Sequence, residues 1–404
     1  MLSLVSYGFY KCNLLIVNYL CGFVVSSVPL VQIFEYLFLS SCAKRCIMRK
    51  IFVFQFIIIV LIMNFTSCKK SVTNHLVNNE NSLEQDRVAG ATEPYLSGTF
   101  VDFWYKQDWS LADWNSFMNE MQGVGVDKVI VQFTAFDNYI WCDSPNNYSA
   151  EKDEKALERL LQAAESYDID VYIGLYNDND FWNYTQDENK LKEYAQKNID
   201  LANDIWINYS HFTSFYGWYI SQETAPYYYQ DDSAFDKLKD NLINPVADFC
   251  YDLSGLPTSI SIFFNQNLST SNDLLYFANR MGATDVDIIM LQDGTGVWDP
   301  ASNAPHCSYN NLQAYYNDAK WGLFGEQPIF GGDLWAISET FNTNSSPETF
   351  YNVKYKFEIV DDFVSEIITF QYYIDMATNT PHSGENKKRA DRLRVEYKDY
   401  YENW

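Results

Sequence analysis

Three carboxylic acid side chains in short, distinctive motifs have the clearest chemical potential in this sequence. Glu223 ends the run Gly-Trp-Tyr-Ile-Ser-Gln-Glu, Glu339 ends Trp-Ala-Ile-Ser-Glu, and Asp293 lies in Gln-Asp-Gly-Thr-Gly. Hydrolysis of a glycosidic bond needs two carboxyl groups at the anomeric carbon. One must be protonated to assist the leaving group, and the other must be ionised as the nucleophile or as the base for water. These three residues are therefore the candidate catalytic groups.

A second set of residues could bind a sugar, through amide and carboxylate groups or through rings that stack on the apolar faces of sugars. The candidates are Asp102, Gln132, Gln222, Gln292, Asp333, Trp104, Trp218 and Trp335. Structural roles compete with each of these assignments. A single tryptophan belongs more often to the core, and Asp293 also fits an ordinary turn in which Asp bonds its own backbone.

Eight short apolar segments, separated by segments of helical period, must position these residues. The predicted strands are Ser97–Trp104, Lys128–Thr134, Asp170–Tyr176, Ser214–Ser221, Thr258–Phe264, Asp287–Gln292, Ile329–Trp335 and Glu366–Tyr373. They are rich in Val, Ile, Phe and Tyr, and several are apolar on both faces. Such runs are typical of parallel strands that helices cover.

The segments between the strands repeat apolar residues at helical spacing. In the first of them, Trp114, Phe117, Met118 and Met121 follow the i, i+3, i+4, i+7 pattern. Ser110 precedes this segment as a predicted N-cap, and Gly123 follows it as a stop. Later helices are predicted around residues 235–251, 272–281, 311–320 and 347–360, the last with Ser346-Pro347 as its start.

Eight alternations of strand and helix predict an α/β fold, a single-domain (β/α)8 TIM barrel. The alternative, an open doubly wound sheet, lacks its Gly-x-Gly-x-x-Gly signature after the first strand. In a barrel the chemistry lies at the C-terminal ends of the strands. We therefore expect Trp104, Glu223, Asp293 and Trp335 to face one mouth.

The motifs Gly217–Glu223, Leu291–Gly296 and Trp335–Glu339 resemble those of a bacterial family of glycosidase-like barrel lipoproteins, known only as a domain of unknown function. The resemblance spans about residues 95–378. More distantly, the layout is similar to the clan of retaining glycoside hydrolases with glutamates after strands four and seven. The resemblance implies that Glu223 is the acid/base and Glu339 the nucleophile. That clan holds the sugar 2-hydroxyl with an asparagine where this chain has Gln222.

The first 94 residues look separate from the barrel. Met48-Arg49-Lys50, an apolar run and Ser67-Cys68 make residues 48–67 resemble a bacterial lipoprotein signal peptide, with Cys68 lipidated. Residues 1–47 then form an upstream extension from a misplaced start codon, or a membrane helix around residues 14–39. Residues 68–94 predict a flexible tether, residues 95–380 the barrel and residues 381–404 a C-terminal helix.

Composition narrows the possible partners. The 53 acidic residues outnumber the 28 Lys and Arg, for a formal net charge of −25, which disfavours nucleic acid. The four histidines and the cysteines after Cys68 are scattered, so we predict neither a metal site nor a cofactor. We expect a carbohydrate as the partner. We also expect a monomeric protein at the bacterial cell envelope, with a lipid anchor as its only contact with the membrane.

The sequence leaves three classes of function open. The first is a glycoside hydrolase acting on an oligo- or polysaccharide through a carboxylate pair, which we expect to be retaining. A wider separation of Glu223 from Asp293 or Asp333 would instead predict inversion. The second class is a glycan-binding lipoprotein without turnover on the same barrel, and the third is a structural surface protein.

Overall fold

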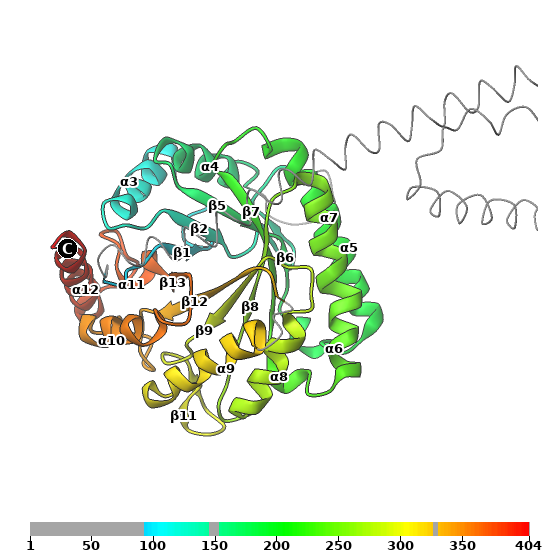
Figure 1. Cartoon of the computed structure of the whole chain (residues 1–404). Coiled ribbons are helices and arrows are strands. Elements are labelled where there is room, and N and C mark those ends of the chain that lie inside the picture. The colour runs from blue at the N-terminus through cyan, green and yellow to red at the C-terminus, as the bar shows by residue number, and fades with distance from the viewer. Residues whose placement is uncertain (1–92, 145–152, 326–329, 404) are drawn as a thin grey trace, which may run out of the picture. The chain divides into compact units, whose positions relative to one another are not determined.

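The computed structural model describes residues 93–144, 153–325 and 330–403. Eight parallel strands close into a barrel in the order β1-β13-β12-β9-β8-β7-β5-β2, with helices around it (Figure 1). The strands are β1 (Gly98–Val101), β2 (Lys128–Val131), β5 (Asp170–Gly174), β7 (Phe215–Thr224), β8 (Thr258–Ile262), β9 (Ile288–Gln292), β12 (Asp333–Glu339) and β13 (Glu366–Phe370). The predicted (β/α)8 barrel is confirmed.

Helices connect successive barrel strands and cover their outer faces (Figure 1). The longer ones are α3 (Leu111–Gln122), α4 (Ala156–Ser166), α5 (Glu188–Tyr209), α6 (Asp232–Leu238), α7 (Asn244–Ser254), α8 (Ser271–Met281), α9 (Leu312–Phe324), α10 (Phe350–Val360) and α12 (Gly384–Glu402). A π-helical turn, η4 (Lys239–Ile243), joins α6 to α7. No helix in the described part of the chain is long and apolar enough to cross a membrane.

Local signals fix most helix starts. Ser110 caps α3 in a reciprocal capping box with Asp113, and Gly123 follows the last turn, as the sequence predicted. The predicted start of α10 at Ser346-Pro347 is wrong. The N-cap is Thr349, whose side chain accepts from the Asn352 backbone N–H, while Pro347 lies in an isolated bridge with Phe341.

Large side chains fill the inside of the barrel. The interior cluster consists of Phe100, Ile130, Tyr172, Tyr219, Ile288, Met290, Trp335, Ile337 and Ile368. These residues recur at two-residue steps along their strands, because alternate side chains of a strand point to the same face. The alternating partners pack outward against the helices in a larger cluster. A residue that follows one of these interior residues by two positions therefore also points to the inner face, closer to the C-terminal end of its strand.

The seventh barrel strand lies further along the chain than predicted. The expected strand was Ile329–Trp335, whereas β12 begins at Asp333 and continues to Glu339. A Cβ on Gly332 would lie 1.9 Å from the Asp287 carbonyl oxygen, and Phe330 packs against Phe324 of α9 with ring centroids 5.7 Å apart. Phe330 therefore packs against a helix, and the apolar residues from Leu334 onward form the strand.

Two small sheets lie beyond the C-terminal ends of the barrel strands. β3 (Ala135–Phe136), β4 (Tyr139–Ile140) and β6 (Tyr176–Asn177) form one, in the order β4-β3-β6. β10 (Trp298–Asp299) and β11 (Ala304–Pro305) form an antiparallel pair between β9 and α9. Short helical turns also follow barrel strands. They are η2 (Phe181–Asn183), η3 (Pro226–Tyr228), η5 (Tyr309–Asn311) and α11 (Tyr372–Asp375).

Candidate active site

Glu223 lies near the C-terminal end of β7, over the barrel interior. Its Oε1 accepts a hydrogen bond from Gln292 Nε2 at 2.9 Å. Gln292 ends β9 at a two-residue step from Met290, an interior residue, so this contact places the Glu223 carboxyl on the inner face. Burial raises the pKa of Glu223, and the bond from Gln292 opposes that shift. A carboxyl group with a raised pKa keeps its proton closer to neutral pH, as a general acid requires.

A pocket of about 460 Å³ opens beside Glu223. Glu223 lies near the C-terminal end of β7, and the other wall residues follow β6, β7, β8 or β9, so the pocket lies at the C-terminal end of the barrel. The wall consists of Trp182, Glu223, Tyr227, Tyr228, Phe263, Asn265, Leu268, Val297, Asp299 and His306.

Aromatic rings form much of this wall. Trp182 of η2 and Tyr228 of η3 stack with ring centroids 5.1 Å apart and planes 27° apart. Phe263 meets His306 edge to face at 4.8 Å. Rings held in this way offer apolar faces beside the polar atoms of Glu223, a combination suited to a molecule with both C–H and hydroxyl groups.

Glu339 ends β12 on the inner face, two residues beyond Ile337 and four beyond Trp335. It is 3% exposed and does not belong to the pocket wall. Its Oε2 accepts from the Gly296 backbone N–H at 2.6 Å. Gly296 precedes the wall residue Val297, so one backbone segment separates Glu339 from the pocket. Burial and the nearby Asp293 raise the pKa of Glu339, while Lys356 acts in the opposite direction.

Asp293 lies beneath that segment as the centre of a buried polar network. Its Oδ2 accepts from Lys356 Nζ at 2.9 Å and from the Glu339 backbone N–H at 3.1 Å. Its Oδ1 accepts from the backbone N–H and the hydroxyl of Thr295, each at 3.0 Å. Lys356, on α10, also donates to the Glu339 carbonyl oxygen. With both oxygens engaged, Asp293 holds the backbone around Glu339.

Asp102, just beyond β1, marks the opposite side of the mouth. Its Oδ2 accepts from Gln371 Nε2 at 2.7 Å and its Oδ1 from the Trp104 backbone N–H at 2.9 Å. Trp104 is 39% exposed and contacts Trp141 edge to face, with ring centroids 4.7 Å apart. Gln132 follows the interior residue Ile130 at a two-residue step and is half-buried. All of these side chains lie at the same end of the barrel as Glu223.

Trp335 and Asp333 were expected at this mouth, and that placement is wrong. Trp335 lies inside the barrel, with its ring 5.4 Å from that of Tyr172. Asp333 is the first residue of β12 and pairs with Ile288, the first residue of β9, so it lies at the N-terminal end of the barrel. The displaced strand explains both errors, because the predicted strand end became the strand start.

Trp218 and Gln222 lie in the layer between barrel and helices, where a sugar in the mouth cannot reach them. Trp218 is fully buried and donates from Nε1 to Ser254 Oγ at 2.9 Å. Gln222 is also fully buried, and its Oε1 accepts from Asn198 Nδ2 of α5 at 3.1 Å. The predicted sugar contacts of both residues are therefore wrong. The amide of Gln222 joins β7 to α5.

The comparisons with known proteins agree with this architecture. Residues 96–385 match the model of a family described as a domain of unknown function, DUF4434. The chain belongs to the DUF4434 family. No curated protein matches it in sequence.

Solved structures similar to this DUF4434 barrel include two proteins described as glycosidases. One is a candidate alpha-L-fucosidase from Bacteroides thetaiotaomicron, with 22% identity over 77% of this chain and 94% of its own, at a TM-score of 0.62. Another is an endo-1,4-beta-D-mannanase from Thermotoga petrophila, with 11% identity over 77% of this chain and 100% of its own, at a TM-score of 0.54. At these identities the likeness establishes the shared barrel fold.

Sequence reasoning missed most of the DUF4434 pocket wall and the lysine beneath it. Trp182, Tyr228 and Asp299 lie in connections after the strands, whereas the sequence interpretation stopped at the strand ends. Phe263 lay inside the predicted strand Thr258–Phe264, but β8 ends at Ile262. Lys356 lies on a helix and gave no signal in the sequence. The second glycine of Gln-Asp-Gly-Thr-Gly was the available sequence clue to the close packing of this segment. In the structure, a Cβ on Gly296 would lie 2.4 Å from the Phe341 carbonyl oxygen.

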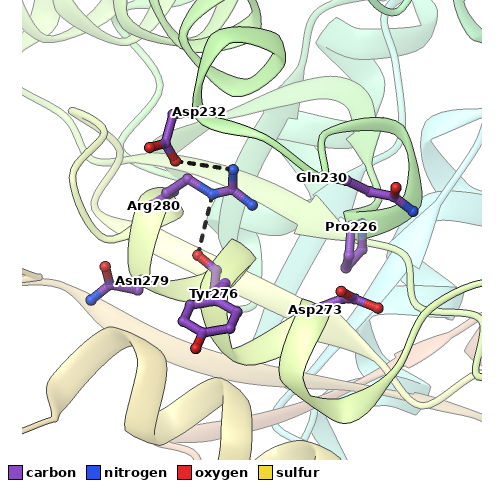
Figure 2. Close-up of a pocket in the computed structure, with 7 residues that line it drawn as sticks. All are labelled: Pro226, Gln230, Asp232, Asp273, Tyr276, Asn279 and Arg280. Carbon is purple, nitrogen blue, oxygen red and sulfur yellow. Dashed lines mark hydrogen bonds and ion pairs between the residues drawn. The ribbon is translucent and has the colours of Figure 1, made fainter.

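A second, smaller pocket of about 190 Å³ lies outside the barrel, between the connection after β7 and helix α8. Figure 2 shows Arg280 reaching toward Asp232, with Pro226 and Gln230 on the opposite side. Arg280 Nη1 and Asp232 Oδ1 lie 3.4 Å apart. In the described parts of the chain, no group of three His, Cys, Asp or Glu side chains is placed to hold a metal ion.

Proposed function

We propose that this DUF4434 protein is a glycoside hydrolase that acts on an oligo- or polysaccharide. The observation that carries the proposal is the Glu223 carboxyl, with its raised pKa, in the wall of an aromatic pocket at the catalytic end of the barrel. The pocket offers stacking surfaces, and Glu223 offers a proton to a departing glycosidic oxygen. An open pocket is the reverse of the closed mouth that a purely structural role predicts.

In this proposal Glu223 is the general acid and Glu339 is the second carboxyl group. Glu339 is held at its strand end by the Gly296 N–H and by the backbone contacts of Asp293 and Lys356. Its position at the C-terminal end of strand seven, with Glu223 at that of strand four, is similar to the layout of the retaining clan. We therefore propose a double displacement with net retention, in which Glu339 attacks the anomeric carbon and Glu223 later activates water.

The test is hydrolysis by the full-length protein across a panel of plant, algal and bacterial polysaccharides and aryl glycosides. The proposal expects turnover that Glu223→Gln and Glu339→Gln each reduce by at least a hundredfold. Proton NMR of the first product should show the anomeric configuration of the substrate. An inverted product would reject Glu339 as the nucleophile but leave Glu223 as the acid.

One observation favours a second function, glycan binding without turnover. Glu339 is nearly fully buried, lies outside the pocket wall and has a raised pKa, whereas a nucleophile must be accessible and ionised. Under this alternative the wild type binds a polysaccharide and releases no product. A Glu223→Gln/Glu339→Gln double variant would then retain the wild-type affinity, measured by affinity electrophoresis.

We also propose that the protein is anchored in the bacterial cell envelope through Cys68, where polysaccharides are available. Cys68 lies outside the described residues, as do the predicted extension, the predicted signal and all but the last two residues of the tether predicted for residues 68–94. Support for the anchor comes from the sequence pattern alone.

A further inference from the structure

The pocket wall around Glu223 has an unusual charge composition. It contains two carboxylic acids, Glu223 and Asp299, and among its described residues it contains no lysine or arginine. Proteins that bind carboxylate or sulfate groups typically supply an arginine or lysine partner, because an unpaired anion loses its hydration without compensation. The composition of the wall therefore bears on which sugars can enter.

Asp299 contributes a permanent negative charge to this wall. Its Oδ1 accepts from the Ala301 backbone N–H at 2.9 Å, and its Oδ2 accepts from Ser302 Oγ at 2.8 Å. These bonds, with that from Ser302 as the largest contribution, hold the pKa of Asp299 below its usual value. The carboxylate stays ionised throughout the neutral range, and the β10–β11 turn fixes its position.

Among the described residues of the wall, only His306 has a side chain that could become a cation near neutral pH. Its ring packs edge to face on Phe263. Burial lowers the pKa of His306, although the nearby Asp299 acts in the opposite direction. His306 is therefore mainly neutral at pH 7, and the net charge of the wall is negative.

We infer that the Glu223 pocket selects uncharged sugars and rejects uronic acids and sulfated sugars. This inference rests on the proposed function, because it concerns the substrate of the same site. An anionic sugar would meet Asp299 without a cation to pair with, and like-charge contacts of this kind penalise binding strongly. A neutral sugar can place its C–H faces on the rings of Trp182, Tyr228 and Phe263 without that penalty.

The test compares one polysaccharide in two charge states. The uncharged polysaccharide that binds best is oxidised at C6, which converts its primary hydroxyls into carboxylates. Affinity electrophoresis of the full-length Glu223→Gln variant then measures binding to both forms without turnover. We expect at least tenfold weaker binding of the oxidised form at low salt. The gap should shrink as salt is raised, because screening weakens charge repulsion.

A matched pair of variants assigns the effect to the pocket. Asp299→Asn keeps the size of the side chain and removes its charge, so it should narrow the difference between the two forms at least threefold. Asp232→Asn removes one negative charge from the second pocket, where Figure 2 shows Asp232 beside Arg280. This control should leave the difference unchanged. Equal narrowing by both variants would assign the discrimination to the overall charge of the protein and overturn the inference.

The remaining outcomes separate the inference from the proposed function. Equal or tighter binding of the oxidised polysaccharide, or binding to anionic polysaccharides alone, overturns the inference even when the wild type hydrolyses its substrate. Discrimination against the oxidised form by a wild type that never releases product supports the inference and rejects hydrolysis. Failure to bind any uncharged glycan of the panel overturns the inference.

Discussion

The two strand-end glutamates have different surroundings although burial raises the pKa of both. Glu223 lies in the pocket wall with one amide donor, Gln292. Glu339 lies outside the wall, next to the Asp293–Lys356 ion pair, with a backbone donor on Oε2. A carboxyl group that has a raised pKa and lies beside a pocket is suited to donate a proton. The local environment therefore favours Glu223 over Glu339 as the acid.

Replacement of the acid is the first prediction. Glu223→Gln keeps the size of the side chain but cannot donate a carboxylic proton, so kcat/KM should fall by about two to four orders of magnitude. Aryl substrates with acidic phenols should lose less, because their departure needs little protonation. Equal losses on good and poor leaving groups, measured by release of the phenol, would show that Glu223 is not the general acid.

The pH dependence of the wild type is the second prediction. A general acid works while protonated, so activity should fall as the pH rises through the pKa of Glu223. Because burial raises that pKa, the alkaline limb of kcat/KM should lie above the value of an exposed glutamate. A limb at or below that ordinary value would contradict the assignment. The same limb should vanish from the residual rate of Glu223→Gln.

The third prediction concerns the loss of stability when the buried ion pair is broken. Lys356→Met leaves Asp293 as an unpaired charge in a fully buried site, which should lower the free energy of unfolding by about 3–5 kcal/mol. Lys388→Met is the control, because its pair with Glu385 has side chains 74% and 68% exposed. That change should cost less than about 1 kcal/mol. Urea unfolding gives both values, and similar losses would contradict the prediction.

At the scale of elements, the segment after β9 connects the two halves of the site. Its residues 293–296 hold Glu339, its next residue Val297 faces the pocket, and β10 carries Asp299. The close approach of Gly296 to Phe341 makes this arrangement possible. A small displacement of this segment would therefore disturb the Glu339 contact and the pocket wall together.

Alanine at this glycine is the fourth prediction. The new Cβ of Gly296→Ala would lie 2.4 Å from the Phe341 carbonyl oxygen, so the segment must move and the bond to Glu339 must lengthen. We expect at least a tenfold loss of kcat. Gly331→Ala is the control, because its Cβ would meet nothing within 4 Å and should leave kcat unchanged. Similar kinetics for the two variants would show that the segment does not support turnover.

At the scale of the whole molecule, an acidic barrel is combined with an N-terminus of lipoprotein pattern. The fifth prediction is that the mature protein in bacterial membranes begins at a lipidated Cys68. Mass spectrometry of the N-terminal peptide should find the acylated cysteine, and Cys68→Ala should release the protein or leave it unprocessed. A peptide from residues 1–47 in the membrane-bound protein would contradict this prediction.

The sequence by itself determined the elements and their order. Two-residue and helical periods are local patterns, and eight alternations of them leave few architectures other than a barrel. They placed Glu223 at the C-terminal end of a strand correctly, although β7 continues to Thr224, three residues beyond its predicted end. The capping signals at Ser110 and Gly123 were equally local and were read correctly.

Only the tertiary structure decided the register of β12, the side of the strand on which each tryptophan lies, and the partners of the buried charges. Apolar residues lie on both sides of Gly331 and Gly332 in the run before Glu339. The pattern therefore could not show that Phe330 packs on a helix while Trp335 fills the barrel. The outward direction of the Trp218 side chain could not be predicted for a similar reason, because both faces of a barrel strand are buried and apolar. Lys356 meets Asp293 from 63 positions away in the chain. Contacts between distant residues depend on how the elements pack, and local sequence patterns carry no record of that packing.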